Sequence, residues 1–147
     1  MKRFNLVRQE QAMGCGIACI ASLLGITYWE AVERWGRCDC QRGFDRKEMA
    51  QILAAIGHPA RRIPPTAATV ESLPVGTIVF LSYTRGWYRR FGHYLLRTKQ
   101  GWMDPWGNRS RRVQRARACY RPLLPQDAPV ASALVPVAWS ARSDDDG

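Results

Sequence analysis

The chain lacks a long run of apolar residues, and this scarcity limits what it can be. Residues 17–24 form an apolar stretch near the N-terminus that is too short to cross a bilayer. The basic start at residues 1–5 is not followed by the hydrophobic core of a signal peptide. We therefore expect neither a signal peptide nor membrane insertion. The expected location is the cytoplasm of the producing cell, with delivery into another cell as an open alternative.

Cysteine is present in a number that does not fit a disulfide framework. Five cysteines, an odd count, are more typical of a reducing compartment. Cys38 and Cys40 provide half of a zinc site, but the remaining candidates are not spaced as a second pair. Cys19, four residues after Cys15 on an apolar helix face, is expected to pack in the core. The sequence thus predicts no metal and no cofactor.

Acidic residues are scarce as well: 12 oppose 22 basic residues, so the net charge is +10. Arginines cluster at residues 61–62, at residues 109–117 and at Arg89 and Arg90, some beside aromatic side chains. Such clusters suit an acidic protein or a nucleic acid, and the lack of a recognisable nucleic-acid-binding motif makes nucleic acid the less favoured partner. Arg89 and Arg90 shortly precede His93, where they would favour acidic substrate residues.

The chain does contain a glycine-flanked cysteine, Gly14-Cys15-Gly16, at the expected start of a helix. Unpaired backbone N–H groups and the positive end of the helix dipole favour a thiolate at this position. The two glycines are expected to leave room for a substrate backbone beside the sulfur. Cys15 is therefore a candidate nucleophile.

Only two histidines are available as a partner for this thiol. His58 lies between Gly57 and a proline, a pattern that ends helices and predicts a loop. His93 follows Gly92 and opens a β-prone run that leads through a turn to a second run ending near Asp104. In such a hairpin, we expect Asp104 to lie near His93.

Together these residues offer the chemistry of thiol-dependent acyl transfer. Cys15 would attack an acyl carbon, His93 would keep it ionised and then protonate the leaving amine, and Asp104 would orient the imidazole. Gln9, six residues before the cysteine, would form an oxyanion hole with the backbone N–H of Cys15. The residues expected to line a substrate groove are Gly14, Gly16, Arg89, Arg90, Gly92 and Trp106.

The coarse pattern places helices before strands. Helices are predicted at residues 15–24, 27–35 and 45–56, the last two beginning with capping boxes. Strands are predicted at residues 77–82, 93–98, 101–103 and 109–113. This order predicts an α+β fold with an antiparallel sheet. Because composition changes to Ala, Pro, Val and Ser from residue 123, we expect a domain over residues 1–122 and a flexible or docked tail over 123–147.

These motifs resemble the papain-like peptidases that remove double-glycine leaders from bacteriocin precursors, usually as the N-terminal domain of an exporting transporter. The resemblance covers roughly residues 4–115 and rests on Gln9, Cys15-Gly16-x-Ala18-Cys19, Leu24-Gly25-Ile26, Gly92-His93-Tyr94 and Asp104-Pro105 followed by Gly107. It implies a papain-like fold, a triad of Cys15, His93 and Asp104, and Gln9 in the oxyanion hole, with Gln11 as its nearest competitor. The chain departs from those transporters in carrying Gly14 where an acidic residue is common, and we expect a free-standing domain.

The preferred hypothesis is a cysteine peptidase that hydrolyses a peptide bond in a peptide or protein substrate through a Cys15 thioester. Its role would be leader-peptide processing or that of a secreted bacterial effector. One alternative is a transglutaminase-like acyl transferase with the same triad. Another is a catalytically silent basic domain that binds an acidic protein or a nucleic acid.

Overall fold

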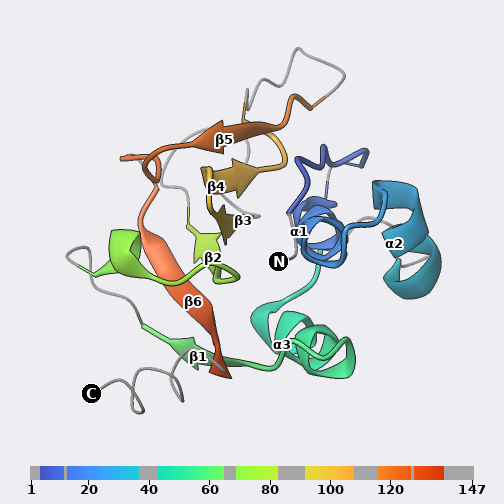
Figure 1. Cartoon of the computed structure of the whole chain (residues 1–147), viewed down its shortest axis with the longest axis horizontal. Coiled ribbons are helices and arrows are strands. Elements are labelled where there is room, and N and C mark those ends of the chain that lie inside the picture. Colours follow the sequence, from blue (N-terminus) through green and yellow to red (C-terminus); the bar gives the residue numbers. More distant parts are fainter. Residues whose placement is uncertain are drawn as a thin grey trace.

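The computed structural model describes residues 4–11, 13–36, 43–64, 69–82, 92–107, 116–126 and 128–137. Within these ranges the protein is α+β, with three α-helices and a six-stranded antiparallel sheet. Figure 1 shows the helices gathered on one side of the sheet. The α+β prediction is therefore confirmed.

Local sequence signals determine where the helices begin. The helices are α1 (Cys15–Leu24), α2 (Tyr28–Trp35) and α3 (Arg46–Ala55), and every bound lies within one residue of the predicted one. Thr27 and Asp45 each cap a helix through a complete capping box. In a capping box, a side chain at each end of the first turn satisfies a backbone N–H at the other. The predicted caps are thus confirmed.

Helix α1 is buried along almost its whole length because it packs on two sides. Its residues from Gly16 to Leu23 are all buried. Figure 1 shows α1 between the sheet and α2: Cys19, Ile20 and Leu23 pack toward the sheet, whereas Ile17, Ala18 and Ala21 pack with α2. In the part of the chain that the structure describes, no single helix is long and apolar enough to cross a membrane, and α1 passes that test only jointly with α2, at a bend of 109°.

The sheet has the strand order β1-β6-β2-β3-β4-β5. The strands are β1 (Ala60–Ile63), β2 (Ile78–Leu81), β3 (His93–Thr98), β4 (Gly101–Asp104), β5 (Cys119–Arg121) and β6 (Val130–Pro136). The strands predicted at 77–82, 93–98 and 101–103 are confirmed as β2, β3 and β4. The strand predicted at 109–113 lies outside the described residues, and β1, β5 and β6 were not predicted.

Strand β6 overturns the predicted boundary at residue 122. It pairs with β1 along one side and with β2 along the other, so it lies inside the sheet. Ala133, Leu134 and Val135 are at most 2% exposed, because β6 is covered on both faces. A strand buried on both faces has a continuous apolar run, without the alternation of apolar and polar residues that marks a half-buried strand. For this reason these residues resemble a tail in the sequence. The rest of the predicted tail, from residue 138, lies outside the described residues.

The two faces of the sheet carry separate cores. One faces α1 and α3, whereas the other is covered by a short 3-10 helix, η1 (Val70–Ser72), and by the chain around Leu124. Glu71 in η1 closes this second face: its Oε1 accepts a hydrogen bond from Trp102 Nε1 at 2.8 Å, and its Oε2 accepts one from the Leu124 N–H at 2.8 Å. The helical face is the one that carries the candidate site.

Candidate active site

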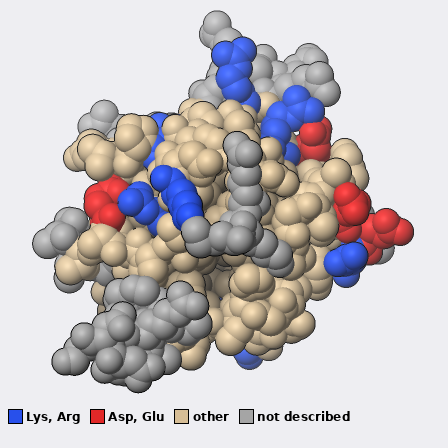
Figure 2. Space-filling model, in the orientation of Figure 1, with Lys and Arg blue, Asp and Glu red and all other residues tan. Residues whose placement is uncertain are grey.

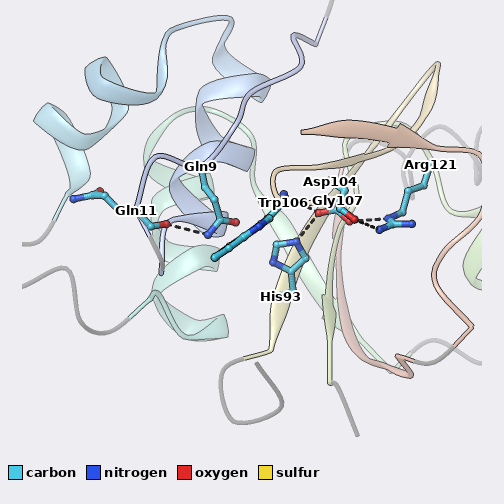
Figure 3. A network of polar contacts seen from close by, with 7 residues as sticks. All are labelled: Gln9, Gln11, His93, Asp104, Trp106, Gly107 and Arg121. Carbon is cyan, nitrogen blue, oxygen red and sulfur yellow. Dashed lines mark hydrogen bonds and ion pairs between the residues drawn. The ribbon is translucent and has the colours of Figure 1, made fainter. Parts of the chain in front are cut away.

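The candidate site forms where the start of α1 meets one end of the sheet. Cys15 is the first residue of α1, His93 the first residue of β3 and Asp104 the last residue of β4. His93 and Asp104 are 7% and 0% exposed, and His93 Nε2 lies 2.6 Å from Asp104 Oδ1 (Figure 3). The structure thus brings these two residues together as the hairpin pattern predicts.

Gly92 controls how the chain enters β3. It has a φ of 68°, a left-handed conformation that favours glycine. A Cβ at this position would lie 2.1 Å from Phe80 Cζ, so the backbone can pass the ring only without a side chain. Phe80 pairs with Tyr94 across β2 and β3. Gly92 therefore positions His93 by permitting a close turn over a neighbouring strand.

Asp104 is a buried carboxylate with three donors. Besides His93, it accepts the Trp106 backbone N–H at 3.0 Å and Arg121 Nε at 2.7 Å (Figure 3). Burial alone would raise the pKa of Asp104, but the charges of His93 and Arg121 and their hydrogen bonds hold that pKa well below its ordinary value. The carboxylate is therefore ionised throughout the neutral range.

Arg121 is the residue of this site that sequence reasoning missed. It lies on β5, and its Nη2 also donates to the Gly107 carbonyl at 2.9 Å, so the guanidinium joins the end of β4 to the following turn. Trp102, on the same strand as Asp104, pairs with Arg121 in the β4–β5 register. The basic residues of this region gave no signal that one of them would face Asp104, because β5 was not predicted.

The electrostatics of His93 favour its protonated form. Burial lowers its pKa, but the Asp104 charge, the hydrogen bond to Asp104, and the hydrogen bond and charge of Cys15 together raise the pKa of His93 to about 10. Since Nε2 faces Asp104, Nδ1 is the ring nitrogen that remains for the sulfur. The arrangement can therefore hold an imidazolium between a carboxylate and a thiol.

Cys15 has a partly exposed thiol that is not in a disulfide, and it lies at the N-terminal end of α1. Gly14 occupies the N-cap position without a side-chain hydrogen bond, and the first turn of α1 contains no acidic residue. The positive end of the helix dipole thus acts on the sulfur without a competing carboxylate from the same turn.

The glycines that flank Cys15 pack closely against neighbouring side chains, and whether they also leave room for a substrate stays a prediction. A Cβ on Gly14 would lie 1.9 Å from Tyr28 Oη, and one on Gly16 would lie 3.1 Å from Met49 Sδ. Both glycines are buried. The space beside them is filled by side chains of α2 and α3, so these two residues allow the helices to approach each other.

Gln9 and Gln11 point in different directions. Gln9 is 3% exposed, its backbone N–H donates to the Pro105 carbonyl at 3.2 Å, and its Nε2 donates to the Gln11 carbonyl at 3.0 Å. Figure 3 shows the Gln9 side chain beside Trp106 and that of Gln11 turned away from His93. Gln11 Oε1 accepts a hydrogen bond from the Tyr28 hydroxyl at 2.8 Å. Of the two glutamines, Gln9 is the one next to the site.

Other residues singled out from the sequence fall into three groups. Cys19 is fully buried, and burial, with the charges of Cys15 and Asp104, raises its pKa well above the ordinary value, so the predicted core position is confirmed. His58 lies in the loop after α3, as expected. Arg89 and Arg90, and both cysteines of the half zinc site, lie outside the described residues. Within the ranges that are described, no three His, Cys, Asp or Glu side chains are grouped to hold a metal ion.

The basic side chains do not form one continuous patch on the face seen in Figure 2. There they lie in separate groups, some next to acidic side chains. Arg61 and Arg62 are exposed on β1, which is at the edge of the sheet order. Charged side chains on an edge strand discourage pairing with other chains. The predicted cluster at 109–117 lies outside the described residues except for its last two positions.

Comparison with known proteins adds no family to this geometry. The chain matches no protein-family model and no curated protein sequence. What the site can do chemically therefore follows from its own parts: a thiol at a helix N-terminus, a buried histidine–carboxylate pair and an amide side chain beside them.

Proposed function

We propose that the protein is a cysteine peptidase with a papain-like fold, in which Cys15, His93 and Asp104 form the catalytic triad. The observation that carries the proposal is the buried 2.6 Å contact between His93 and Asp104 next to the Cys15 thiol. A nucleophile at the start of the first helix, packed on an antiparallel sheet, agrees with the papain-like resemblance of the sequence.

The first half of the reaction forms an acyl-enzyme. The Cys15 proton passes to His93 Nδ1, and the sulfur attacks the carbonyl carbon of the scissile peptide bond. The tetrahedral intermediate collapses as the C–N bond breaks and His93 donates its proton to the leaving amine. The new N-terminus departs, and a thioester joins the substrate's acyl group to Cys15.

The second half restores the thiol. A water molecule gives a proton to His93 as its oxygen attacks the thioester carbon, and the C–S bond then breaks. The sulfur recovers a proton from His93, and the second product leaves as a carboxylic acid. Throughout both halves, Asp104 holds the ring orientation and stabilises the imidazolium.

Gln9 is the proposed side-chain donor of the oxyanion hole, together with the Cys15 backbone N–H. Its burial and its backbone hydrogen bond to Pro105 hold it beside the triad, whereas the Gln11 side chain points away from His93 and its Oε1 accepts the Tyr28 hydroxyl (Figure 3). Fixed donors are effective because they need no reorganisation as negative charge develops on the oxygen. In other enzymes, loss of one such donor costs about 100- to 1000-fold in rate.

The proposed substrate is a peptide or protein, cleaved in leader processing or by an effector acting on another cell. We place the reaction in a reducing compartment such as the cytoplasm, because the nucleophile is a thiol. No step requires a metal or a cofactor.

The test is the pH dependence of iodoacetamide alkylation at Cys15, mapped by mass spectrometry. We expect Cys15 to react fast below pH 7, and His93→Ala to abolish this reaction while His58→Ala leaves it intact. Cys119 provides an internal reference, since burial and the Asp104 charge, opposed by Arg121, raise its pKa. If Cys15 reacts no faster than Cys119 at neutral pH in the wild type, the peptidase proposal is wrong.

A further inference from the structure

Arg46 presents a cation near the site that the triad does not use. It is the first residue of α3, and its guanidinium carbon lies 5.4 Å from the centre of the Phe80 ring. Stacking on an aromatic ring holds a guanidinium in place through its face. The N–H groups at the edge of a guanidinium form the fork that matches a carboxylate.

The charge of Arg46 has no counter-ion in the described part of the chain. The carboxylates nearest to it in sequence, Asp45 and Glu48, accept backbone N–H groups in the capping box of α3. Neither forms an ion pair with Arg46, and the side chain is only partly exposed. A half-buried cation that forms no ion pair with a described residue has lost hydration that an incoming anion would replace.

A continuous set of contacts connects Arg46 to the nucleophile. The centres of the Phe80 and Tyr94 rings lie 4.9 Å apart. A Cβ on Gly16, the residue after Cys15, would lie 3.5 Å from Tyr94 Cδ2. Burial and the Cys15 charge raise the pKa of the Tyr94 hydroxyl, whereas Arg46 lowers it, so both groups lie within electrostatic range of one side chain.

Phe80 also connects Arg46 to the base. Its ring packs against Gly92, and the next residue of β2, Leu81, pairs with His93. Arg46 thus lies on the α3 side of the same strand ends that carry the catalytic histidine. A substrate that lies across these strand ends, beside His93, would meet this guanidinium.

We propose that Arg46 is a specificity residue that binds a carboxylate of the substrate near the scissile bond. The inference rests on the proposed peptidase function. The carboxylate has two sources, an Asp or Glu side chain or the free C-terminus of a short peptide, and both present the same planar acceptor to the guanidinium.

The test is cleavage of a synthetic peptide mixture of randomised sequence by the full chain, with products identified by mass spectrometry. The best substrate is then remade with Glu→Gln or Asp→Asn, and separately with an amidated C-terminus, and kcat/KM is measured for each. Wild type is compared with Arg46→Gln, and with Arg34→Gln as a matched control, because Arg34 stacks on Trp35 at 5.8 Å on α2. Thermal unfolding of each variant reports whether it is folded.

We expect wild type to prefer the carboxylate over its amide by about tenfold, near the lower end for a charge-assisted hydrogen bond at a partly exposed site. Arg46→Gln should abolish that preference, Arg46→Lys should retain part of it, and Arg34→Gln should retain all of it. Dependence on the side chain or on the C-terminus identifies the source. A wild type without the preference, or an Arg46→Gln that keeps it, would overturn the inference alone. Failure of the wild type to cleave any peptide would overturn the proposed function and this inference together.

Discussion

Replacing Arg121 with glutamine should destabilise the protein more than any other removal of a surface arginine on the sheet. Arg121 Nε donates to Asp104 Oδ2 at 2.7 Å, and Asp104 is fully buried. Glutamine is too short to keep both this contact and the one to the Gly107 carbonyl. The substitution therefore leaves a buried carboxylate with only His93 and the Trp106 backbone N–H as donors.

The size of the effect follows from burial. Removing one partner of a fully buried ion pair costs about 3–5 kcal/mol. The Arg121 side chain is 23% exposed and Asp104 keeps other donors, so we expect a loss of about 2–3 kcal/mol in the free energy of unfolding at pH 7. For a domain of this size, such a loss lowers Tm by about 5–10 °C.

The pH dependence gives the prediction its sharpest signature. The folded-state pKa of Asp104 is lowered, so its stabilising contribution is present above the unfolded value of about 3.9 and is lost as pH falls through the folded value. We therefore expect urea unfolding at pH 7 and at pH 3 to show that the difference in free energy of unfolding between wild type and Arg121→Gln is smaller at pH 3. Protonation of Asp104 in the variant removes the buried charge that causes this difference in stability.

Arg97→Gln is the matched control. Its side chain is 24% exposed, close to that of Arg121, but its Nη1 lies 3.9 Å from Glu71 Oε1 and its guanidinium stacks on Trp102 at 5.2 Å. Such a pair is worth about 1 kcal/mol or less. Equal losses in the two variants, or a gap for Arg121→Gln that is the same at pH 3 and pH 7, would refute the reasoning.

Three further predictions concern other parts of the fold. Because the folded-state pKa of His93 is raised, the stability of wild type relative to His93→Gln should be greatest below pH 6.5 and fall as pH rises through about 10, as urea titrations across this range can measure. Gly14→Ala, whose Cβ would lie 1.9 Å from Tyr28 Oη, should cost about 1–3 kcal/mol, and less in a Tyr28→Phe background, in a double-mutant cycle by thermal unfolding. A chain ending at residue 122 should show no cooperative thermal transition, because it lacks β6, whereas one ending at residue 137 should show one.

The features predicted from the sequence are those that depend on short-range signals. The capping boxes that begin α2 and α3 lie within four residues each. The approach of His93 to Asp104 depends on a hairpin whose turn, residues 99–100, lies between two strands of clear β propensity. In each case the residues that specify the feature are close in sequence, so their pattern is sufficient.

The features that were missed depend on partners distant in sequence. Strand β6 lies between β1 and β2, so its apolar run has meaning only once both neighbours are in place. Arg121 reaches Asp104 only because β5 pairs with β4. The role of Gly14 depends in the same way on the packing of α2 against α1, which brings the Tyr28 hydroxyl to the position that a Cβ would need. No local pattern encodes these contacts.

The position of Cys15 relative to His93 depends on how the helical layer is held against the sheet. The N-terminal segment, residues 4–9, forms hydrogen bonds with both layers. Ser22 Oγ in α1 donates to the Asn5 carbonyl, whereas the Tyr120 hydroxyl in β5 donates to the Phe4 carbonyl at 3.2 Å. The Gln9 backbone N–H donates to the carbonyl that follows Asp104. Cys15, the proposed nucleophile, belongs to one layer and His93, its proposed base, to the other. The segment that joins these layers also carries Gln9, the proposed oxyanion donor. The hydrogen bonds of this segment to both layers therefore help to set the distance between Cys15 and His93.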